Sequence, residues 1–301
     1  MKIGAIDIGS NAVRLLIVEV IIYDKTDIQF NQINFLRLPL RLGVDVFQTG
    51  EVSPQNSQKM LHAMHVFQSL LTFYDVKFVK VCATSAMRDA KNSNEIIQSV
   101  KQQTGIEIQV ISGEEEAFLA HHYHISQNMD REHGFLYANI GGGSSDVIYV
   151  VNGEIKYRKS FNIGTIRLLN NLVKQSDWEN MKAELKANIR GPLPVLAIGS
   201  GGNINKIFSL SKKKQGKPLT LGFLKKFYES LKCFSKEELI HNYNLREDRA
   251  DVIVPAMQIY INIMRWSNIT EIYVPRIDLV DGLARALFKE VGPKFKPDLR
   301  S

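Results

Sequence analysis

The chain has 301 residues, which is enough for two domains of ordinary size, each with its own hydrophobic core. Its content of 45% hydrophobic and 23% charged residues, with only 9 prolines, excludes a fibrous or an intrinsically disordered protein. The formal net charge of +7 favours anionic ligands, but no helix-turn-helix, zinc-finger or RNP-like pattern accompanies it, so we expect no nucleic-acid partner.

The N-terminal stretch I-G-A-I-D-I-G-S-N-A-V-R-L-L-I-V-E-V predicts two strands joined by a small polar turn. The first strand-like run is interrupted by Asp7 and Asn11 and lacks the cleavage pattern of a signal peptide. No apolar run in the chain approaches the roughly 20 residues that a membrane-spanning helix needs. We therefore expect a cytoplasmic protein without a membrane partner.

A third strand is predicted over 28–35, and the stretch 37–50, which contains glycine and proline, is typical of a loop. Ser53 and Pro54 then provide an N-cap and a first-turn proline. Apolar residues at three-to-four spacing over 60–74 predict an amphipathic helix of about five turns.

Histidine and cysteine residues give little sign of metal or redox chemistry. His62 and His65 interleave with the apolar stripe of this helix and have no acidic or cysteine partner at ligand spacing, so we expect them at the surface. Cys82 lies in an apolar strand and Cys233 in a helix-like segment, which predicts two buried thiols in a reducing compartment.

Strands and helices alternate through the rest of the first half, which indicates an α/β layered domain. The predicted elements are a strand over 76–82 that leads into A-T-S-A-M-R-D-A-K-N, a helix capped by Asn92 or Ser93 and ended by Gly105, a strand over 106–111, and a helix entered through S-G-E-E-E-A-F-L-A-H-H.

The stretch A-N-I-G-G-G-S-S-D-V-I-Y-V, residues 138–150, predicts another pair of strands joined by a tight turn. Glycines without a Cβ atom let backbone N–H groups converge on an anion, and Ser144 and Ser145 add hydroxyl donors. A hairpin turn without a ligand is the alternative. Asp7 aligns with Asn139 and Gly9 with Gly141, so the chain resembles a duplicated α/β unit with two domains facing each other across a cleft.

The second half repeats the alternation and contains a third glycine-rich turn, G-S-G-G-N-I-N-K-I, which opens a helix. A lysine-rich run around Gly216 and Pro218 is typical of a solvated loop. The predicted elements are a strand to Phe161, helices from Gly164 and over 178–189, a strand over 195–198, helices over 220–231 and 236–242, a helix over 247–266 kinked at Pro255, a strand over 272–274 and a final helix over 279–290.

Six motifs occur in compatible order along nearly the whole chain: D-I-G-S-N-A-V-R-L (7–15), A-T-S-A-M-R-D-A-K-N (83–92), I-S-G-E-E-E-A (111–117), I-G-G-G-S-S-D (140–146), I-G-S-G-G (198–202) and R-A-D-V-I-V-P-A (249–256). Together they resemble the Ppx/GppA family of exopolyphosphatases and guanosine pentaphosphate phosphatases, within the actin-like ATPase superfamily. The resemblance implies an α/β fold of two duplicated actin-like (ribonuclease H-like) domains flanking a cleft. We expect domain I over 1–122, with the helix of about 279–301 packed back on it, and domain II over 123–278.

The resemblance also implies a catalytic pair. Glu116 would be the general base that activates water against a terminal phosphoryl group, and Arg88 would pair with the phosphoryl oxygens. Alternatively, Glu114, Glu115 and Glu116 only stabilise a helix N-terminus, and Arg88 only pairs with a local acid such as Asp89.

Phosphate and metal ligands follow from the same resemblance. Asp7 and Asp146 would hold Mg²⁺ or another divalent cation through hard oxygen ligands. The expected phosphate-binding residues share small or cationic side chains and are Ser10, Asn11, Arg14, Ser85, Gly142, Gly143, Ser144, Gly201 and Gly202.

The chain departs from the family pattern in three places. Asn139 stands at the usual aspartate position, and an amide can neither carry the charge of a metal ligand nor accept a proton. Asp146 stands where the family has a longer glutamate, and Val280-Asp281-Gly282 replaces the motif R-E-G. These departures predict lowered metal-dependent turnover.

We expect an exopolyphosphatase that releases terminal phosphate from inorganic polyphosphate, with guanosine pentaphosphate as the alternative substrate. A second hypothesis is a catalytically weak regulator that binds polyphosphate or guanosine penta- or tetraphosphate. A kinase of the same superfamily is a third, although no sugar-binding motif supports it. The resemblance implies a homodimer.

Overall fold

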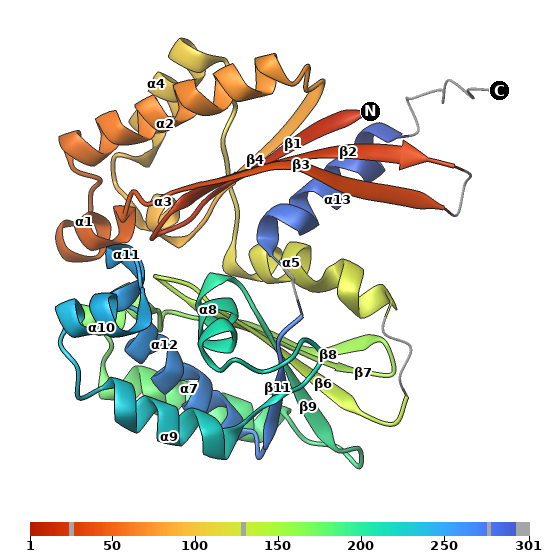
Figure 1. Ribbon diagram of the computed structural model, residues 1–301, viewed down its shortest axis with the longest axis vertical. Coiled ribbons are helices and arrows are strands. Elements are labelled where there is room, and N and C mark those ends of the chain that lie inside the picture. Colours follow the sequence, from red (N-terminus) through yellow and green to blue (C-terminus); the bar gives the residue numbers. More distant parts are fainter. Residues whose placement is uncertain (24–26, 128–130, 276–277, 293–301) are drawn as a thin grey trace. The chain divides into compact units, whose positions relative to one another are not determined.

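The computed structural model describes residues 1–23, 27–127, 131–275 and 278–292 (Figure 1). The chain forms two compact units, one of Met1–Ile111 with Leu279–Ser301 and the other of Ser112–Asp278. Each unit has its own β-sheet, and helices pack on that sheet.

The first unit is built on a mixed sheet with the strand order β3-β2-β1-β4-β5. Sequence neighbours β1, β2 and β3 pair antiparallel, whereas β1 pairs parallel with β4, and β4 with β5. The strands are β1 (Lys2–Ile8), β2 (Val13–Ile22), β3 (Ile28–Leu38), β4 (Phe78–Ala83) and β5 (Gln109–Val110).

Helices cover both faces of this sheet, as Figure 1 shows. They are α1 (Leu42–Thr49), α2 (Pro54–Phe73), α3 (Ser85–Asp89), α4 (Ser93–Thr104) and α13 (Leu279–Val291). Ile6, Ile8 and Leu15 share one core with Met64 and Phe67 of α2. Residues that alternate with these along the strands turn to the other face, where α13 packs on β1, β2 and β4. Burial from both sides explains why β1 is apolar at nearly every position.

Helix α2 begins where the sequence predicts. The Ser53 side chain accepts a hydrogen bond from the Asn56 N–H at 3.3 Å, and Pro54 occupies the first turn. The preceding stretch, in contrast, is not the predicted loop, because α1 lies within it. Leu42 and Val46 are buried in the core, and tertiary packing outweighs the low helix propensity of Gly43.

The second unit contains a mixed sheet with the strand order β10-β11-β9-β6-β7-β8. Strand β6 pairs antiparallel with β7 and parallel with β9, the same arrangement that β1 has with β2 and β4. The strands are β6 (Gly134–Ile140), β7 (Ser145–Val151), β8 (Glu154–Phe161), β9 (Val195–Ser200), β10 (Leu219–Thr220) and β11 (Glu271–Tyr273).

The helices of this unit are α5 (Gly113–Gln127), α6 (Thr165–Leu169), α7 (Gln175–Asn188), α8 (Gly202–Leu210), α9 (Leu221–Leu231), α10 (Lys236–Tyr243), α11 (Glu247–Ala250) and α12 (Ile253–Trp266). Helix α5 covers one face, where Ala117 and Ile125 pack against Tyr137 and Ile148. These contacts group α5 with the second unit, whereas the predicted domain I extends to residue 122.

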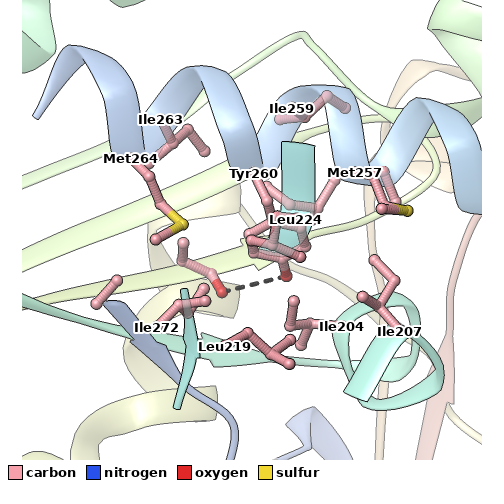
Figure 2. Packing of buried hydrophobic residues seen from close by; sticks show 14 of the residues in the cluster. Ile204, Ile207, Leu219, Leu224, Met257, Ile259, Tyr260, Ile263, Met264 and Ile272 are labelled. Atoms are coloured by element: carbon pink, nitrogen blue, oxygen red, sulfur yellow. Dashed lines mark hydrogen bonds between the residues drawn. The ribbon is translucent and has the colours of Figure 1, made fainter. Parts of the chain in front are cut away.

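The other face of this sheet carries the larger core, which is made mainly by α7, α8, α9 and α12. Figure 2 shows Tyr260 and Met264 of α12 among apolar side chains from α8, α9, β10 and β11. Tyr260 is completely buried, and its hydroxyl donates to the backbone oxygens of Ser200 at 3.2 Å and Ala138 at 3.5 Å. Burial raises the pKa of this hydroxyl far above its ordinary value, so it stays a proton donor.

Two local predictions are wrong. The segment 247–266 is two helices, α11 and α12, and Pro255 lies in the first turn of α12 instead of kinking a longer helix. A proline ring clashes with the carbonyl four residues earlier, which is that of Asp251, and the helix is interrupted there. Cys233 is exposed just beyond α9, whereas Cys82 is buried as predicted. Among the described residues, no helix is both long and apolar enough to cross a membrane.

Candidate functional site

In the first unit, the predicted phosphate-binding serines meet at one end of the sheet. Because β1 and β4 run parallel, both strands end at the same edge, with Ile8 opposite Ala83. Ser10 follows β1 and Ser85 opens α3 after β4, and their buried hydroxyl oxygens lie 2.7 Å apart. The pair therefore presents two hydroxyl groups at the strand ends, where open α/β sheets bind their ligands.

Asp7 and Arg14 face each other across the β1–β2 hairpin. They are register partners, and the Arg14 Nη1 atom donates to the Asp7 Oδ2 atom at 3.0 Å. The Asp7 carboxylate is almost fully buried, so its charge depends on this compensation. Arg14 is therefore the ion-pair partner of Asp7, which is a candidate metal ligand. A contact between Arg14 and phosphate would use the N–H groups of its guanidinium that do not bind Asp7.

Arg88 lies in α3, one turn after Ser85, and its Nη1 atom donates to the Ile111 backbone oxygen at 2.8 Å. An ion pair with Asp89 is the local alternative to phosphate binding that the sequence predicts. The partner that the structure gives is a carbonyl group. A guanidinium group has five N–H donors, so one such bond orients Arg88 and leaves capacity for an anion.

The triple-glycine turn of the second unit, Gly141–Gly143, is held by the segment that opens α6. The N–H groups of Thr165 and Ile166 donate to the Gly141 and Gly142 oxygens at 3.0 and 2.9 Å. Arg167 Nε donates to the Gly143 oxygen at 2.8 Å. Carbonyl groups of the turn are thus engaged, while among the described residues the N–H groups of Gly142 and Gly143 donate to no other backbone group. Such N–H groups are suited to an anion.

The Asp146 carboxylate lies beside this turn and beside the start of α5. Ser144 Oγ is 3.4 Å from Asp146 Oδ2, and a Cβ atom on Gly113 would lie 3.2 Å from Asp146 Oδ1. Gly113 is the first residue of α5, and a carboxylate near a helix N-terminus is stabilised by the helix dipole. The absence of a side chain at 113 allows this approach, since a Cβ there would also overlap Ser160.

The three glutamates of the first turn of α5 have different environments. Glu114 is exposed and pairs with Arg158 at 2.8 Å, and Glu115 is also exposed. Glu116 is buried at 8% exposure. This difference in exposure separates Glu116 from Glu114 and Glu115.

The third glycine turn lies next to the second because β6 and β9 are parallel, with Asn139 opposite Ser200. A Cβ atom on Gly201, whose φ is 84°, would lie 2.4 Å from the Asn139 Oδ1 atom. The Asn139 amide is therefore packed against the turn. Asn139 thus has a structural role, packing against the Gly201 turn, that does not require a metal ion.

Two residues at this turn were not assigned by the sequence analysis. Arg249 lies against Gly202, and its Nη1 atom donates to Asn203 Oδ1 at 3.0 Å. Asn203 in turn donates to the Ile140 oxygen at 2.8 Å, at the start of the triple-glycine turn. The motif R-A-D-V-I-V-P-A contained Arg249, but only folding brings it to the glycines.

The oxygen donors present suit a hard cation such as Mg²⁺, which prefers carboxylates and phosphate oxygens. Within the part of the chain that the structure describes, however, no group of three or more histidine, cysteine, aspartate or glutamate residues could hold a metal ion. Asp7 in the first unit and Asp146 in the second are each buried. Each carboxylate by itself supplies hard oxygen ligands, and phosphate oxygens and water would have to complete the coordination of such a cation.

The sheets and turns define an actin-like α/β protein with glycine- and serine-lined turns suited to phosphate. A family model described as the Ppx/GppA phosphatase family matches residues 21–284, and the chain belongs to this family. The resemblance seen in the sequence is thereby confirmed. The crystal structure of an exopolyphosphatase from Cytophaga hutchinsonii, 23% identical, has a TM-score of 0.82 and covers 96% of this chain and 98% of its own. This likeness confirms the predicted two-domain fold.

Among similar proteins is Exopolyphosphatase 1 of Mycobacterium tuberculosis, 29% identical over 171 residues, or 56% of this chain and 48% of the relative. Guanosine-5'-triphosphate,3'-diphosphate pyrophosphatase of Vibrio vulnificus is 24% identical over 303 residues, or 96% of this chain and 59% of the relative. The chain thus spans about half the length of the curated relatives that it matches.

Proposed function

We propose that this chain hydrolyses a terminal phosphoanhydride bond and releases inorganic phosphate, with inorganic polyphosphate as the substrate. The observation that carries the proposal is the junction of α5, Asp146 and the triple-glycine turn in the second unit. There, a helix start bearing the buried Glu116 adjoins a carboxylate and a row of backbone N–H groups. This junction combines acids for water activation with donors for phosphate.

In the proposed reaction, Glu116 accepts a proton from water as the water oxygen attacks the terminal phosphorus atom. The anhydride bond breaks, and the shortened polyphosphate leaves. Gly142, Gly143 and Ser144 of the second unit would bind phosphoryl oxygens through N–H and hydroxyl donors. In the first unit, Ser10 and Ser85 would donate from their paired hydroxyls, and Asn11, Arg14 and Arg88 would add polar and cationic groups.

Gly201 and Gly202 of the third glycine turn would add backbone N–H donors, and the guanidinium group of Arg249 would add positive charge there. Asp7 and Asp146 would be the protein's oxygen ligands for Mg²⁺ or another divalent cation. A bound cation would neutralise charge on the phosphate oxygens. The homodimer implied by the resemblance and the cytoplasmic location expected from the sequence stay predictions.

The test compares Glu116→Gln with Glu115→Gln, a matched control that removes the same charge from the neighbouring exposed position. Phosphate release would be measured with Mg²⁺ and polyphosphates of defined length. Loss of the general base should lower kcat by about 10²–10⁴-fold in Glu116→Gln only, and excess EDTA should abolish release by the wild type. Equal rates in the two variants would contradict the assignment of Glu116.

Guanosine pentaphosphate is the second candidate substrate, favoured by the match to the Vibrio vulnificus pyrophosphatase over 96% of this chain. The same assay with this nucleotide decides between the two, since the preferred substrate has the higher kcat/KM.

A binding-only regulator is the alternative from another class. It is favoured by the Asn139 amide, which packs on Gly201 and is a neutral group. Tight binding of tripolyphosphate without phosphate release by the wild type would support it.

A further inference from the structure

A buried histidine on α5 has no place in the proposed reaction. His121 is fully buried, and it lies on the sheet-facing stripe of the helix that also carries Ala117 and Ile125. Both of these neighbours on the stripe are apolar. A polar ring in such a place is costly unless it is hydrogen-bonded, so its contacts are informative.

The His121 ring contacts β6 and β9. Its Nε2 atom lies 3.2 Å from the Ser200 Oγ atom, and its ring centroid lies 5.0 Å from that of Tyr137. Ser200 is the last residue of β9 and is itself 1% exposed. The contact therefore joins α5 to the residue that immediately precedes the Gly201–Gly202 turn.

Ser200 is held from both faces of the sheet. On the face of α5 its hydroxyl meets His121, and on the opposite face its backbone oxygen accepts from the Tyr260 hydroxyl of α12 at 3.2 Å. Gly201 then takes a positive φ of 84° against the Asn139 amide. A small displacement of Ser200 would be passed directly to the turn, because Gly201 has no side chain of its own to fix it.

We propose that His121 is a positioning residue that fixes α5, and with it Glu116, relative to the Gly201–Gly202 turn through Ser200. The inference rests on the proposed function, in which α5 carries the base and the turn binds phosphate. Catalysis depends on alignment of such groups, and a misplacement of about 1 Å can cost about 10²-fold in rate. A buried hydrogen bond between two elements is a means of fixing one arrangement of them.

The test uses His121→Leu, which fills the space without the hydrogen bond, His121→Gln, which restores a polar group of similar reach, and Ser200→Ala. We expect His121→Leu and Ser200→Ala each to lower kcat for tripolyphosphate by about 10–100-fold with little change in KM. The double variant should be no worse than either single variant, because both remove one contact. His121→Gln should recover most of the loss.

Ile125→Ala is the matched control, since it truncates another buried residue of the same stripe. It should lower the melting temperature but leave kcat unchanged well below that temperature. Hydrogen exchange supplies a readout that does not depend on activity. Amides of 199–203 should exchange faster in His121→Leu and Ser200→Ala, and as in the wild type in Ile125→Ala.

The inference would be overturned if His121→Leu had the amide exchange rates at 199–203 and the kcat of the wild type. It would also be overturned if the reduction of kcat in the double variant equalled the product of the reductions in the two single variants. If the wild type releases no phosphate, the proposed function fails. In that case the exchange rates at 199–203 alone support or overturn the link between α5 and the turn.

Discussion

Gly164 shows how the lack of a side chain shapes the triple-glycine turn. A Cβ atom at this position would lie 2.3 Å from the Gly142 oxygen and 2.5 Å from the carbonyl carbons of Gly142 and Gly143. These are backbone atoms and cannot swing away as the end of a flexible side chain can. Close approach of two backbone segments thus holds the turn in place.

We expect Gly164→Ala to destabilise the second unit by about 1–3 kcal/mol through overpacking, and to weaken tripolyphosphate binding as the turn shifts. The matched control is Gly222→Ala, in the first turn of α9, where a Cβ meets nothing within 4 Å. That change should be neutral or stabilising by up to about 1 kcal/mol. Urea unfolding and tripolyphosphate titration of both variants would check this, and equal behaviour would contradict it.

At the scale of elements, a polar cluster connects β8 to α7. Glu184 of α7 accepts from Lys159 Nζ at 2.6 Å and from the Tyr157 hydroxyl at 3.0 Å, and both donors belong to β8. The hydrogen bonds from Lys159 and Tyr157 lower the pKa of the Glu184 carboxyl. Burial, followed by the hydrogen bond to Glu184, raises the pKa of Tyr157.

The lowered pKa of Glu184 predicts a pH-dependent stability. Its contribution is full above the unfolded-state pKa of about 4.3 and is lost as the pH falls through the lower folded-state pKa. Glu184→Gln should therefore destabilise the second unit by about 0.2–1 kcal/mol at pH 7, and the difference should shrink as the pH falls below about 4. Lys159→Gln and the double variant complete a thermodynamic cycle. If the difference in free energy of unfolding between the wild type and Glu184→Gln did not change with pH, the predicted contribution of the Lys159–Glu184 ion pair would be contradicted.

At the scale of the whole molecule, the chain leaves the first unit at Ser112 and returns to it with α13. Leu283 of α13 and Leu231 of α9 are both fully buried, each in a different unit. The chain's 2 tryptophans, Trp178 and Trp266, both belong to the second unit, with ring centroids 5.9 Å apart. Tryptophan fluorescence therefore reports the second unit directly.

Truncation of either leucine to alanine should cost about 2–5 kcal/mol in its own unit. We expect Leu231→Ala to shift the fluorescence-detected urea transition strongly. Leu283→Ala should shift the transition seen by far-ultraviolet circular dichroism and accelerate amide exchange in 2–22, with a smaller effect on fluorescence. Identical shifts of all probes in both variants would instead show that the two units unfold as one.

Local sequence determined most of the elements and the position of the glycine turns. Apolar periodicity and the Ser53-Pro54 cap located α2, and the runs around Gly141–Gly143 located β6 and β7. Such features depend on near neighbours in the chain, which the sequence displays. Helix α1 was missed because the burial of Leu42 and Val46, and not their local pattern, stabilises it.

Tertiary structure alone decided which polar residues meet. Parallel pairing of β1 with β4 brings Ser10 to Ser85, and parallel pairing of β6 with β9 brings Asn139 to the Gly201 turn. No spacing in the sequence encodes these contacts, because crossover connections between parallel strands vary freely in length. The candidate phosphate-binding residues could therefore be predicted from the sequence. The residues that each of them contacts were determined by strand order and packing.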